Sequence, residues 1–127
     1  KGLDDIVHFN GWVHGLKLEE LLSNSDILVL PSWAEGFPNA VIEAMAAGLA
    51  VIVTSVGNIP DILTHNSEAL LVAPKDVDSL RSAIARLVDD EILIRSLALK
   101  GHEFAKENFA IEEAVSKLEK LIYAVAH

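Results

Sequence analysis

Cysteine is absent from the sequence. Its absence excludes disulfide bonds, thiol catalysis and metal sites built on thiolates. The histidines also lack the i, i+4 spacing and the acidic neighbours of a typical metal site, so we expect no metal ion. These histidines are His8, His14, His65, His102 and His127. A chain without cysteine fits a reducing compartment, and we expect a cytoplasmic protein.

Long apolar runs are lacking as well. Every apolar stretch is interrupted by Glu, Asp, Gly or Pro well before the roughly 20 residues that a membrane-spanning helix needs. The first residues do not combine a basic segment with an apolar one, so we expect no signal peptide. The chain opens on Lys1 and runs almost at once into "IVHFNG", and we therefore expect it to be a piece of a longer protein.

Positive charge is scarce, because 10 Lys and Arg residues stand against 19 Asp and Glu residues, for a net charge of −9. Such a surface repels nucleic acids and anionic lipids. A phosphate-bearing ligand must then be held locally, by backbone N–H groups, by a helix N-terminus or by another domain. The sequence has no Walker or dinucleotide-binding glycine motif and no nucleophile elbow, which argues against hydrolase chemistry.

Aliphatic runs and helical periods alternate along the chain. The runs predict strands at 6–9, 26–32, 49–55 and 69–73, and the periodic segments predict helices at 16–25, between Pro38 and Gly48, from a cap at Asp76, at 91–107 and along 111–125. This alternation is typical of an α/β fold with a mostly parallel, Rossmann-like sheet and flanking helices. Ligands bind such sheets at the carboxyl ends of the strands, here within 10–15, 31–39, 54–61 and 73–76.

The segment "EGFPNAVIEAMAAG", residues 35–48, carries two glutamates in an otherwise apolar setting. Glu43 has two interpretations. It can lie on an ordinary solvent-exposed helix face, with Glu35 as a plain loop carboxylate. Alternatively, because positions 40–42 and 44–47 are all Ala, Val, Ile or Met, the helix has no obvious wet face and Glu43 points into a ligand cleft.

The loop before this helix favours the second interpretation. Gly36 allows the backbone to approach a ligand, and the N–H groups around Phe37 and Asn39 form a helix N-terminus suited to phosphate or to a sugar edge. Carboxylates accept hydrogen bonds from vicinal hydroxyls. Two carboxylates, one before and one after a helix N-terminus that can bind phosphate, therefore suit a nucleotide sugar.

These residues resemble the Glu-x7-Glu motif of the retaining glycosyltransferases of group 1, or family 4. The resemblance extends through "VHFNGWV", "SDILVLPSWAEGFPNAVIEAMAAGLAVIVTSVGNIPDIL" and "ALLVAPKDVDSLRSAIARLVDD". It implies that residues 1–127 are part of the C-terminal, donor-binding domain of a two-domain GT-B enzyme, truncated at its N-terminal side. The whole enzyme would transfer a sugar from a nucleoside diphosphate to a hydroxyl acceptor with retention, in the cytoplasm or peripheral to the inner membrane.

The resemblance also assigns roles to individual positions. Glu35 matches the catalytic-site glutamate that contacts the donor sugar, and Glu43 matches the one that holds the ribose hydroxyls. The other implied donor contacts are Gly36, Phe37, Pro38 and Asn39, whose backbone faces the sugar and diphosphate, and Gly11, Trp12 and Val13 beside the nucleobase. Trp12 is equally compatible with a place in the core. No metal or other cofactor is implied, and the favoured donor is UDP-linked.

Two further expectations concern partners. The family's strand order, 3-2-1-4-5-6, places two strands that precede this chain between "IVHF" and "DILVLP". The resulting open edges predict a homodimer or exchanged strands. The alternatives to a transferase domain are a non-catalytic binding or assembly module on the same fold, and a domain of another GT-B enzyme, either a phosphorylase or a nucleotide-sugar epimerase. The isolated chain is expected to be inactive.

Overall fold

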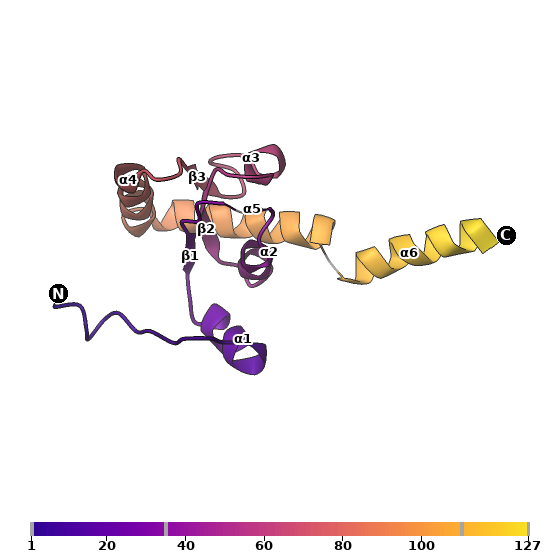
Figure 1. The fold of residues 1–127 in the computed structure, drawn as a ribbon, viewed down its shortest axis with the longest axis horizontal. Coiled ribbons are helices and arrows are strands. Elements are labelled where there is room, and N and C mark those ends of the chain that lie inside the picture. The colour runs from indigo at the N-terminus through magenta and orange to yellow at the C-terminus, as the bar shows by residue number, and fades with distance from the viewer. Residues whose placement is uncertain (1, 35, 110, 127) are drawn as a thin grey trace.

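The computed structural model describes residues 2–34, 36–109 and 111–126, with only the backbone described for 111–117. Helices and strands alternate along the chain, as the sequence predicts (Figure 1). The elements are α1 (Gly15–Ser23), β1 (Ile27–Leu30), α2 (Asn39–Ala46), β2 (Ala50–Thr54), α3 (Ile59–Ile62), β3 (Leu70–Val72), α4 (Val77–Val88), α5 (Glu91–Phe109) and α6 (Ile111–Ala126).

The three strands form one parallel sheet in the order β1-β2-β3. Ile52 of β2 lies level with Val29 of β1 and with Leu70 of β3. β2 is buried along its whole length, which explains its unbroken aliphatic sequence. β1 is only half-buried, because β2 is its only neighbour among the described residues. The predicted α/β class with a parallel sheet is confirmed.

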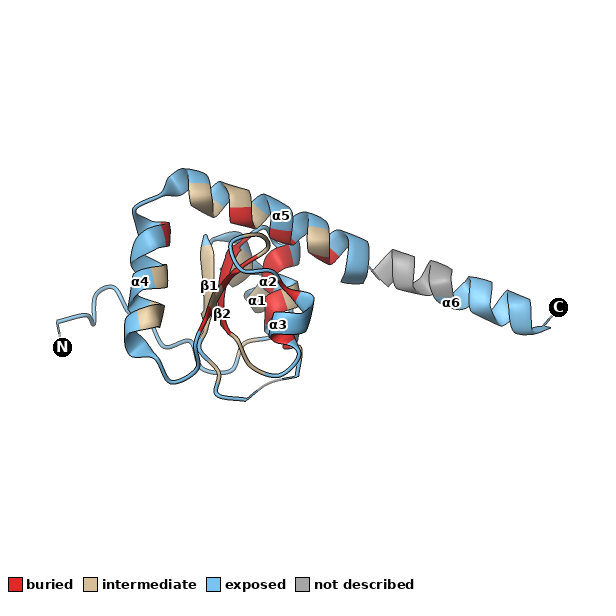
Figure 2. Ribbon diagram, turned by 90° about the horizontal axis from the view of Figure 1, so that it is seen from above, coloured by how far each residue is buried: buried red, intermediate tan, exposed pale blue. Residues whose placement is uncertain are grey.

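The core consists of two layers, one on each face of the sheet. Successive side chains of a strand point to opposite faces, so β2 sends Val51 and Val53 into one layer and Ala50 and Ile52 into the other. The first layer packs against α2 and the second half of α5, and the second packs against α4 and the first half of α5. Figure 2 shows α2 and α4 on opposite sides of the strands, with α5 running past both.

Both ends of α2 are set by residues that the sequence marks. Pro38 occupies the N-cap with extended backbone angles, and Gly48 follows the C-cap at a φ of +83°. The N–H groups of Gly48 and Leu49 donate to the carbonyls of Met45 and Ala44, which is the Schellman arrangement that ends a helix at a left-handed glycine. From α5, His102 Nδ1 donates to the Ala46 carbonyl at 2.9 Å.

A glycine brings α5 close to α2. A Cβ on Gly101 would lie 3.2 Å from the Glu68 carbonyl oxygen and 3.3 Å from Cγ of Met45. At Gly101 the backbone of α5 therefore packs directly against the first core layer. Met45 is fully buried there.

The first turn of α4 offers a direct test of capping. Asp76→Ala is expected to lower the free energy of unfolding by about 1 kcal/mol, because the Ser79 N–H loses its 2.9 Å hydrogen bond to Asp76 Oδ1. Asp78→Ala, which removes an exposed carboxylate paired with Arg81 in the same turn, should cost about 0.5 kcal/mol or less. Urea denaturation measures both changes, and equal losses would contradict the capping role.

The N-terminal part departs from expectation. Residues 6–9 were predicted to form a strand, yet they form none, because none of the described strands lies beside them to accept their backbone hydrogen bonds. The predicted helix near 16–25 is present as α1, which has no buried residue and reaches the first core layer through Leu22. Figure 1 shows this segment standing off the sheet.

The C-terminal helix projects beyond α5 (Figure 1). Its last residues are exposed, including Leu118, Leu121, Ile122 and Val125, which share one helical face. Within the described residues, each helix is too short or too polar to traverse a lipid bilayer.

Candidate functional site

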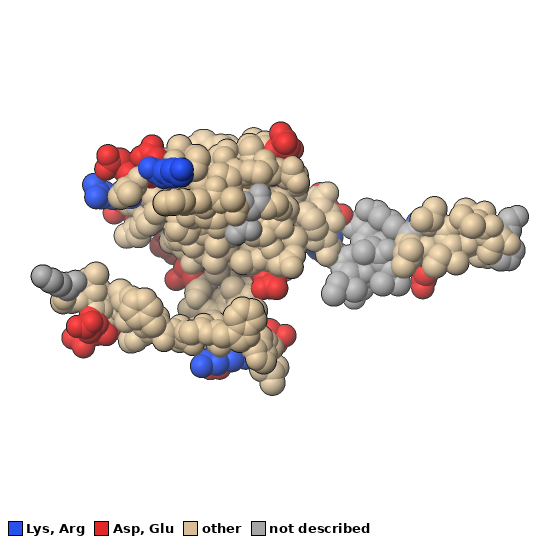
Figure 3. Space-filling view, in the orientation of Figure 1, with Lys and Arg blue, Asp and Glu red and all other residues tan. Residues whose placement is uncertain are grey.

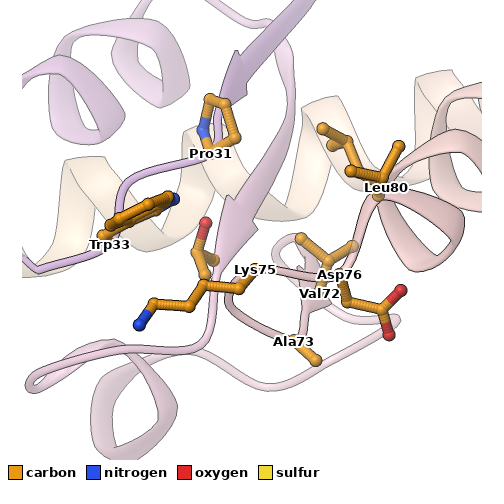
Figure 4. Close-up of a pocket in the computed structure, with 9 residues that line it drawn as sticks. Pro31, Trp33, Val72, Ala73, Lys75, Asp76 and Leu80 are labelled. Carbon is orange, nitrogen blue, oxygen red and sulfur yellow. The ribbon is translucent and has the colours of Figure 1, made fainter.

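The carboxyl ends of the three strands meet at one edge, where ligands bind in parallel α/β sheets. A cavity of about 410 Å³ opens at this edge. It lies among the segments that follow β1 and β3 and the start of α4 (Figure 4). The cavity is lined by Pro31, Trp33, Thr54, Val72, Ala73, Lys75, Asp76, Val77 and Leu80.

Trp33 and Lys75 form one wall of this cavity. The Lys75 ammonium lies 5.0 Å from the centroid of the Trp33 ring, within cation–π range. Lys75 adopts a left-handed backbone conformation, φ +59°, and its side chain extends to the Trp33 side of the cavity (Figure 4). The contact joins the loop after β1 to the loop after β3. Trp33 remains 71% exposed, so most of the indole surface is open to a ligand.

Two other lining residues are held in place by hydrogen bonds to the sheet and to α4. Thr54 ends β2 and is buried, and its hydroxyl donates to the Leu30 carbonyl at 3.3 Å. Asp76 turns toward α4, where it caps the helix. The polar side-chain groups that line the cavity are thus the Lys75 ammonium, the Thr54 hydroxyl, the capping carboxylate of Asp76 and the indole N–H of Trp33.

Sequence reasoning missed Trp33 and Lys75. Both lie in segments predicted to follow strands. An aromatic residue and a cation in such segments could have indicated residues that line a ligand cavity. Their contact was not predictable, because 42 positions separate them and their meeting depends on the parallel order of β1 and β3.

The predicted donor loop leads into α2. Glu35 lies outside the described residues. Gly36 and Asn39 are exposed, while Pro38 is buried. The Phe37 ring stacks on Phe109 of α5 with centroids 5.5 Å apart, so this side chain belongs to the packing and only its backbone is available to a ligand.

Glu43 lies on the solvent-exposed face of α2. The expectation that this helix has no solvent-exposed face is wrong. Ala40, Glu43 and Ala47 are all exposed and share one face. Alanine is tolerated in water as well as in a core, so its presence does not reveal burial. Glu43 does not line the cavity beside Trp33. None of the described residues of the predicted site lines that cavity.

The predicted nucleobase loop precedes α1. Gly11 has a φ of +65° and is exposed, and Val13 is half-buried. Trp12 is 90% exposed, which overturns the alternative that it packs into the core.

The surface charge gives no broad anion-binding area on the face shown in Figure 3. Lys and Arg side chains gather over α4 and appear singly at α1, and the remainder is neutral with scattered acids. In the described ranges, no three His, Cys, Asp or Glu side chains come together in a way that would hold a metal ion. His65 is used structurally, since its Nδ1 accepts the Leu71 N–H at 2.9 Å.

The family described as glycosyl transferases group 1 matches residues 1–90, which include the whole glutamate motif and all three strands. The chain belongs to this family. The resemblance predicted from the sequence is therefore confirmed.

Curated relatives match most of the chain. The chain is 34% identical over 130 residues to the MMP alpha-(1->4)-mannosyltransferase of Mycolicibacterium hassiacum, covering 98% of this chain and 32% of that protein. It is 35% identical over 106 residues to the N-acetyl-alpha-D-glucosaminyl L-malate synthase of Bacillus anthracis, covering 84% and 28%. This group 1 chain thus spans about a third of the length of the curated relatives that it matches.

Solved structures confirm the Rossmann-like fold of GT-B C-terminal domains. Sucrose-phosphate synthase from Thermosynechococcus elongatus superimposes with a TM-score of 0.83 at 32% identity, over 97% of this chain and 32% of that one. The C-terminal domain of a group 1 glycosyl transferase from Francisella tularensis gives 0.78 at 30% identity, over 87% and 57%. HepE of Anabaena shares the fold at a TM-score of 0.84 and 20% identity, over 97% and 33%.

Proposed function

We propose that residues 1–127 belong to the donor-binding domain of a retaining glycosyltransferase and hold a nucleoside diphosphate sugar at the start of α2. The observation that carries this proposal is the position of the glutamate motif. Its described part begins at the exposed Gly36, in the segment that follows β1, and runs through the Pro38 cap to the exposed Glu43 on α2. The unpaired N–H groups of a helix start favour a diphosphate, and the neighbouring carboxylates accept sugar hydroxyls.

The exposed face of α2 supports a close approach of the nucleotide. Glu43 is four positions after Asn39, so the two lie about 6 Å apart along the helix axis. Ala40 and Ala47 flank Glu43 and project little beyond the backbone. Apart from Asn39, one turn earlier, the neighbours of Glu43 on this face are these small side chains, so its carboxylate is open to a ribose.

In the proposed reaction, the bond between the sugar's anomeric carbon and the diphosphate breaks, and the acceptor hydroxyl oxygen bonds to the same face of the sugar ring. The hydroxyl proton passes to the leaving diphosphate. Glu35 contacts the donor sugar and is the proposed catalytic-site residue. The backbone N–H groups of 36–39 stabilise the charge that develops on the leaving diphosphate. This scheme needs no metal ion from the chain. Gly11, Trp12 and Val13 are the proposed nucleobase contacts.

We favour a uridine nucleotide as the donor. HepE, which shares the fold, is described in complex with UDP and glucose and with UDP-glucose. The apolar cavity beside Trp33 is a separate feature of the same edge. With one ammonium group and an open indole face, it suits the apolar side of a sugar ring better than a diphosphate.

Calorimetric titration of the chain with UDP, UDP-glucose and GDP-mannose tests this proposal. We expect saturable, one-to-one binding of at least one nucleotide sugar, competed by the matching nucleoside diphosphate. We expect no sugar transfer by the isolated chain, and detectable transfer would contradict that part. Absence of binding to every nucleotide sugar would favour a non-catalytic module on this fold.

A further inference from the structure

A further cavity, of about 230 Å³, lies between β3, α4 and the loop that leads into β3. β3 and Ala83 supply its apolar lining, and its polar lining consists of His65 in the loop and Ser79, Ser82 and Arg86 on α4. It shares only Val72 with the cavity beside Trp33. The two cavities are therefore separate sites.

Two serine hydroxyls on α4 are available to a ligand in this cavity. Ser79, Ser82 and Arg86 lie on one face of the helix, because residues three and four positions apart are neighbours there. Neither serine hydroxyl has a hydrogen-bond partner among the described residues. Each hydroxyl can therefore donate a hydrogen bond to a ligand.

The positive charge of Arg86 is not neutralised by a carboxylate within the described part of the chain. Arg81 and Arg95 each pair with a carboxylate of their own helix. Arg86 instead donates from Nη1 to the side-chain oxygen of Asn66, which is a neutral amide. A guanidinium has five N–H donors, so several remain for a ligand.

The imidazole of His65 has a defined proton position. The Leu71 N–H donates to its Nδ1 at 2.9 Å. A ring nitrogen that accepts a hydrogen bond carries no proton, so the proton of His65 lies on Nε2. The remaining nitrogen of His65 is therefore a donor.

The loop that carries His65 is held in place before any ligand binds. The Thr64 N–H donates to Glu68 Oε2 at 2.7 Å, which engages this carboxylate inside the loop. Asn66 adopts a left-handed backbone conformation, φ +64°, and its hydrogen bond from Arg86 ties the loop to α4. A site that is already ordered loses less conformational entropy when it binds a ligand.

We propose that this cavity binds a phosphoryl group, either as inorganic phosphate or as the phosphate end of a small phosphorylated metabolite. Its polar side chains are one cation, one imidazole that donates and two hydroxyls, and all of them can donate to the acceptor oxygens of phosphate. The donors belong to two separate elements, so they suit a group with several oxygens better than a planar carboxylate with two.

Volume and charge restrict the ligand further. About eight water molecules, at about 30 Å³ each, would fill the cavity. This leaves room for phosphate with a group about the size of glycerol, whereas pockets for larger organic ligands begin at about 300 Å³. The net charge of −9 opposes an anion at long range, so binding must come from local contacts.

Titration of the isotope-labelled chain with inorganic phosphate, followed by NMR at constant ionic strength, tests the proposal. We expect the amide signals of 65–71 and 79–86 to shift and to saturate below about 10 mM phosphate. Saturating UDP should not displace the phosphate, because the proposed donor site is at the start of α2. Shifts confined to 36–43, or shifts that do not saturate, would overturn the proposal. The donor site is judged separately, from the shifts that UDP itself causes at 36–43.

Arg86→Gln should weaken phosphate binding at least about 10-fold, because a hydrogen bond to a charged group is lost. Ser82→Asp should abolish binding, since its carboxylate lies four positions before Arg86 and pairs with the guanidinium. Arg81→Gln is the matched control. It makes the same charge change on the same helix, but Arg81 lines a different hollow, so the affinity should stay within about two-fold. Equal losses in the two arginine variants would mean general charge attraction and would overturn the proposal.

The three variants are expected to fold, because Arg81, Ser82 and Arg86 are exposed. Titrations with glycerol phosphate and with acetate then define the ligand. Tighter binding of glycerol phosphate than of phosphate supports a phosphorylated metabolite, and equal affinity supports free phosphate. Acetate that binds as tightly as phosphate would overturn the assignment of a phosphoryl site.

Discussion

Glu43→Gln is expected to weaken the binding of a uridine diphosphate donor by about 10- to 100-fold. A hydrogen bond to a charged group contributes about 1.5–3 kcal/mol, and the amide that replaces the carboxylate keeps only one acceptor oxygen. Calorimetric titration with UDP measures the loss. The same titration with the 2′,3′-dideoxy nucleotide should show almost no difference between the variant and the wild-type chain, because the hydroxyls that Glu43 is proposed to hold are missing.

Glu103→Gln provides the control, since Glu103 is also an exposed helical glutamate but lies on α5. It carries the same charge change and should leave UDP binding unaltered. Equal affinity of the Glu43 and Glu103 variants for UDP would mean that Glu43 is an ordinary surface residue. Glu43 is exposed and takes no part in the core, so its substitution should leave the free energy of unfolding unchanged. A loss of affinity for UDP would then not be explained by unfolding of the chain.

Ile52→Ala is expected to lower the free energy of unfolding by about 2–5 kcal/mol. Ile52 is fully buried at the centre of the middle strand, where it lies between Val29 and Leu70. The truncated side chain leaves a cavity that neighbouring strands cannot close without breaking their register. A domain of this size is stable by only about 5–15 kcal/mol, so the loss is a large part of the total. Urea denaturation followed by circular dichroism measures it.

Ile92→Ala is the matched change on the surface. Ile92 is 81% exposed in the first turn of α5, so its truncation removes little buried area and slightly favours the helix. We expect a change within about 0.5 kcal/mol of zero. If Ile52→Ala were as mild as Ile92→Ala, the assignment of β2 as the centre of the core would be wrong.

The parts of the fold that sequence analysis predicted well are those whose signals are local. "LAVIVTS" predicted the central strand, because an unbroken aliphatic run is compatible only with burial on both faces. Helix ends were predicted at Pro38, Gly48 and Asp76. Pro38 and Gly48 act through their own backbone angles, and Asp76 acts through a hydrogen bond to a backbone group three residues away. The family followed from the same residues, and the match over 1–90 confirmed it.

The errors arose where a residue's environment is supplied by distant elements. Residues 6–9 have the composition of a strand, but a strand exists only when another lies beside it, and no described strand does. The alanines of α2 suggested complete burial, yet Ala40 and Ala47 face solvent beside Glu43. Trp12 had two possible places, and its 90% exposure excludes the core.

The sequence by itself determined the family, the alternation of strands and helices, and the segments that follow the carboxyl ends of the strands. These properties depend on the order of residues along the chain and on short-range backbone preferences. Only the tertiary structure decided that Trp33 meets Lys75, that Phe37 stacks on Phe109 and that Glu43 faces outward. Such contacts join residues far apart in the chain, and their geometry is set by how helices and strands pack rather than by local sequence.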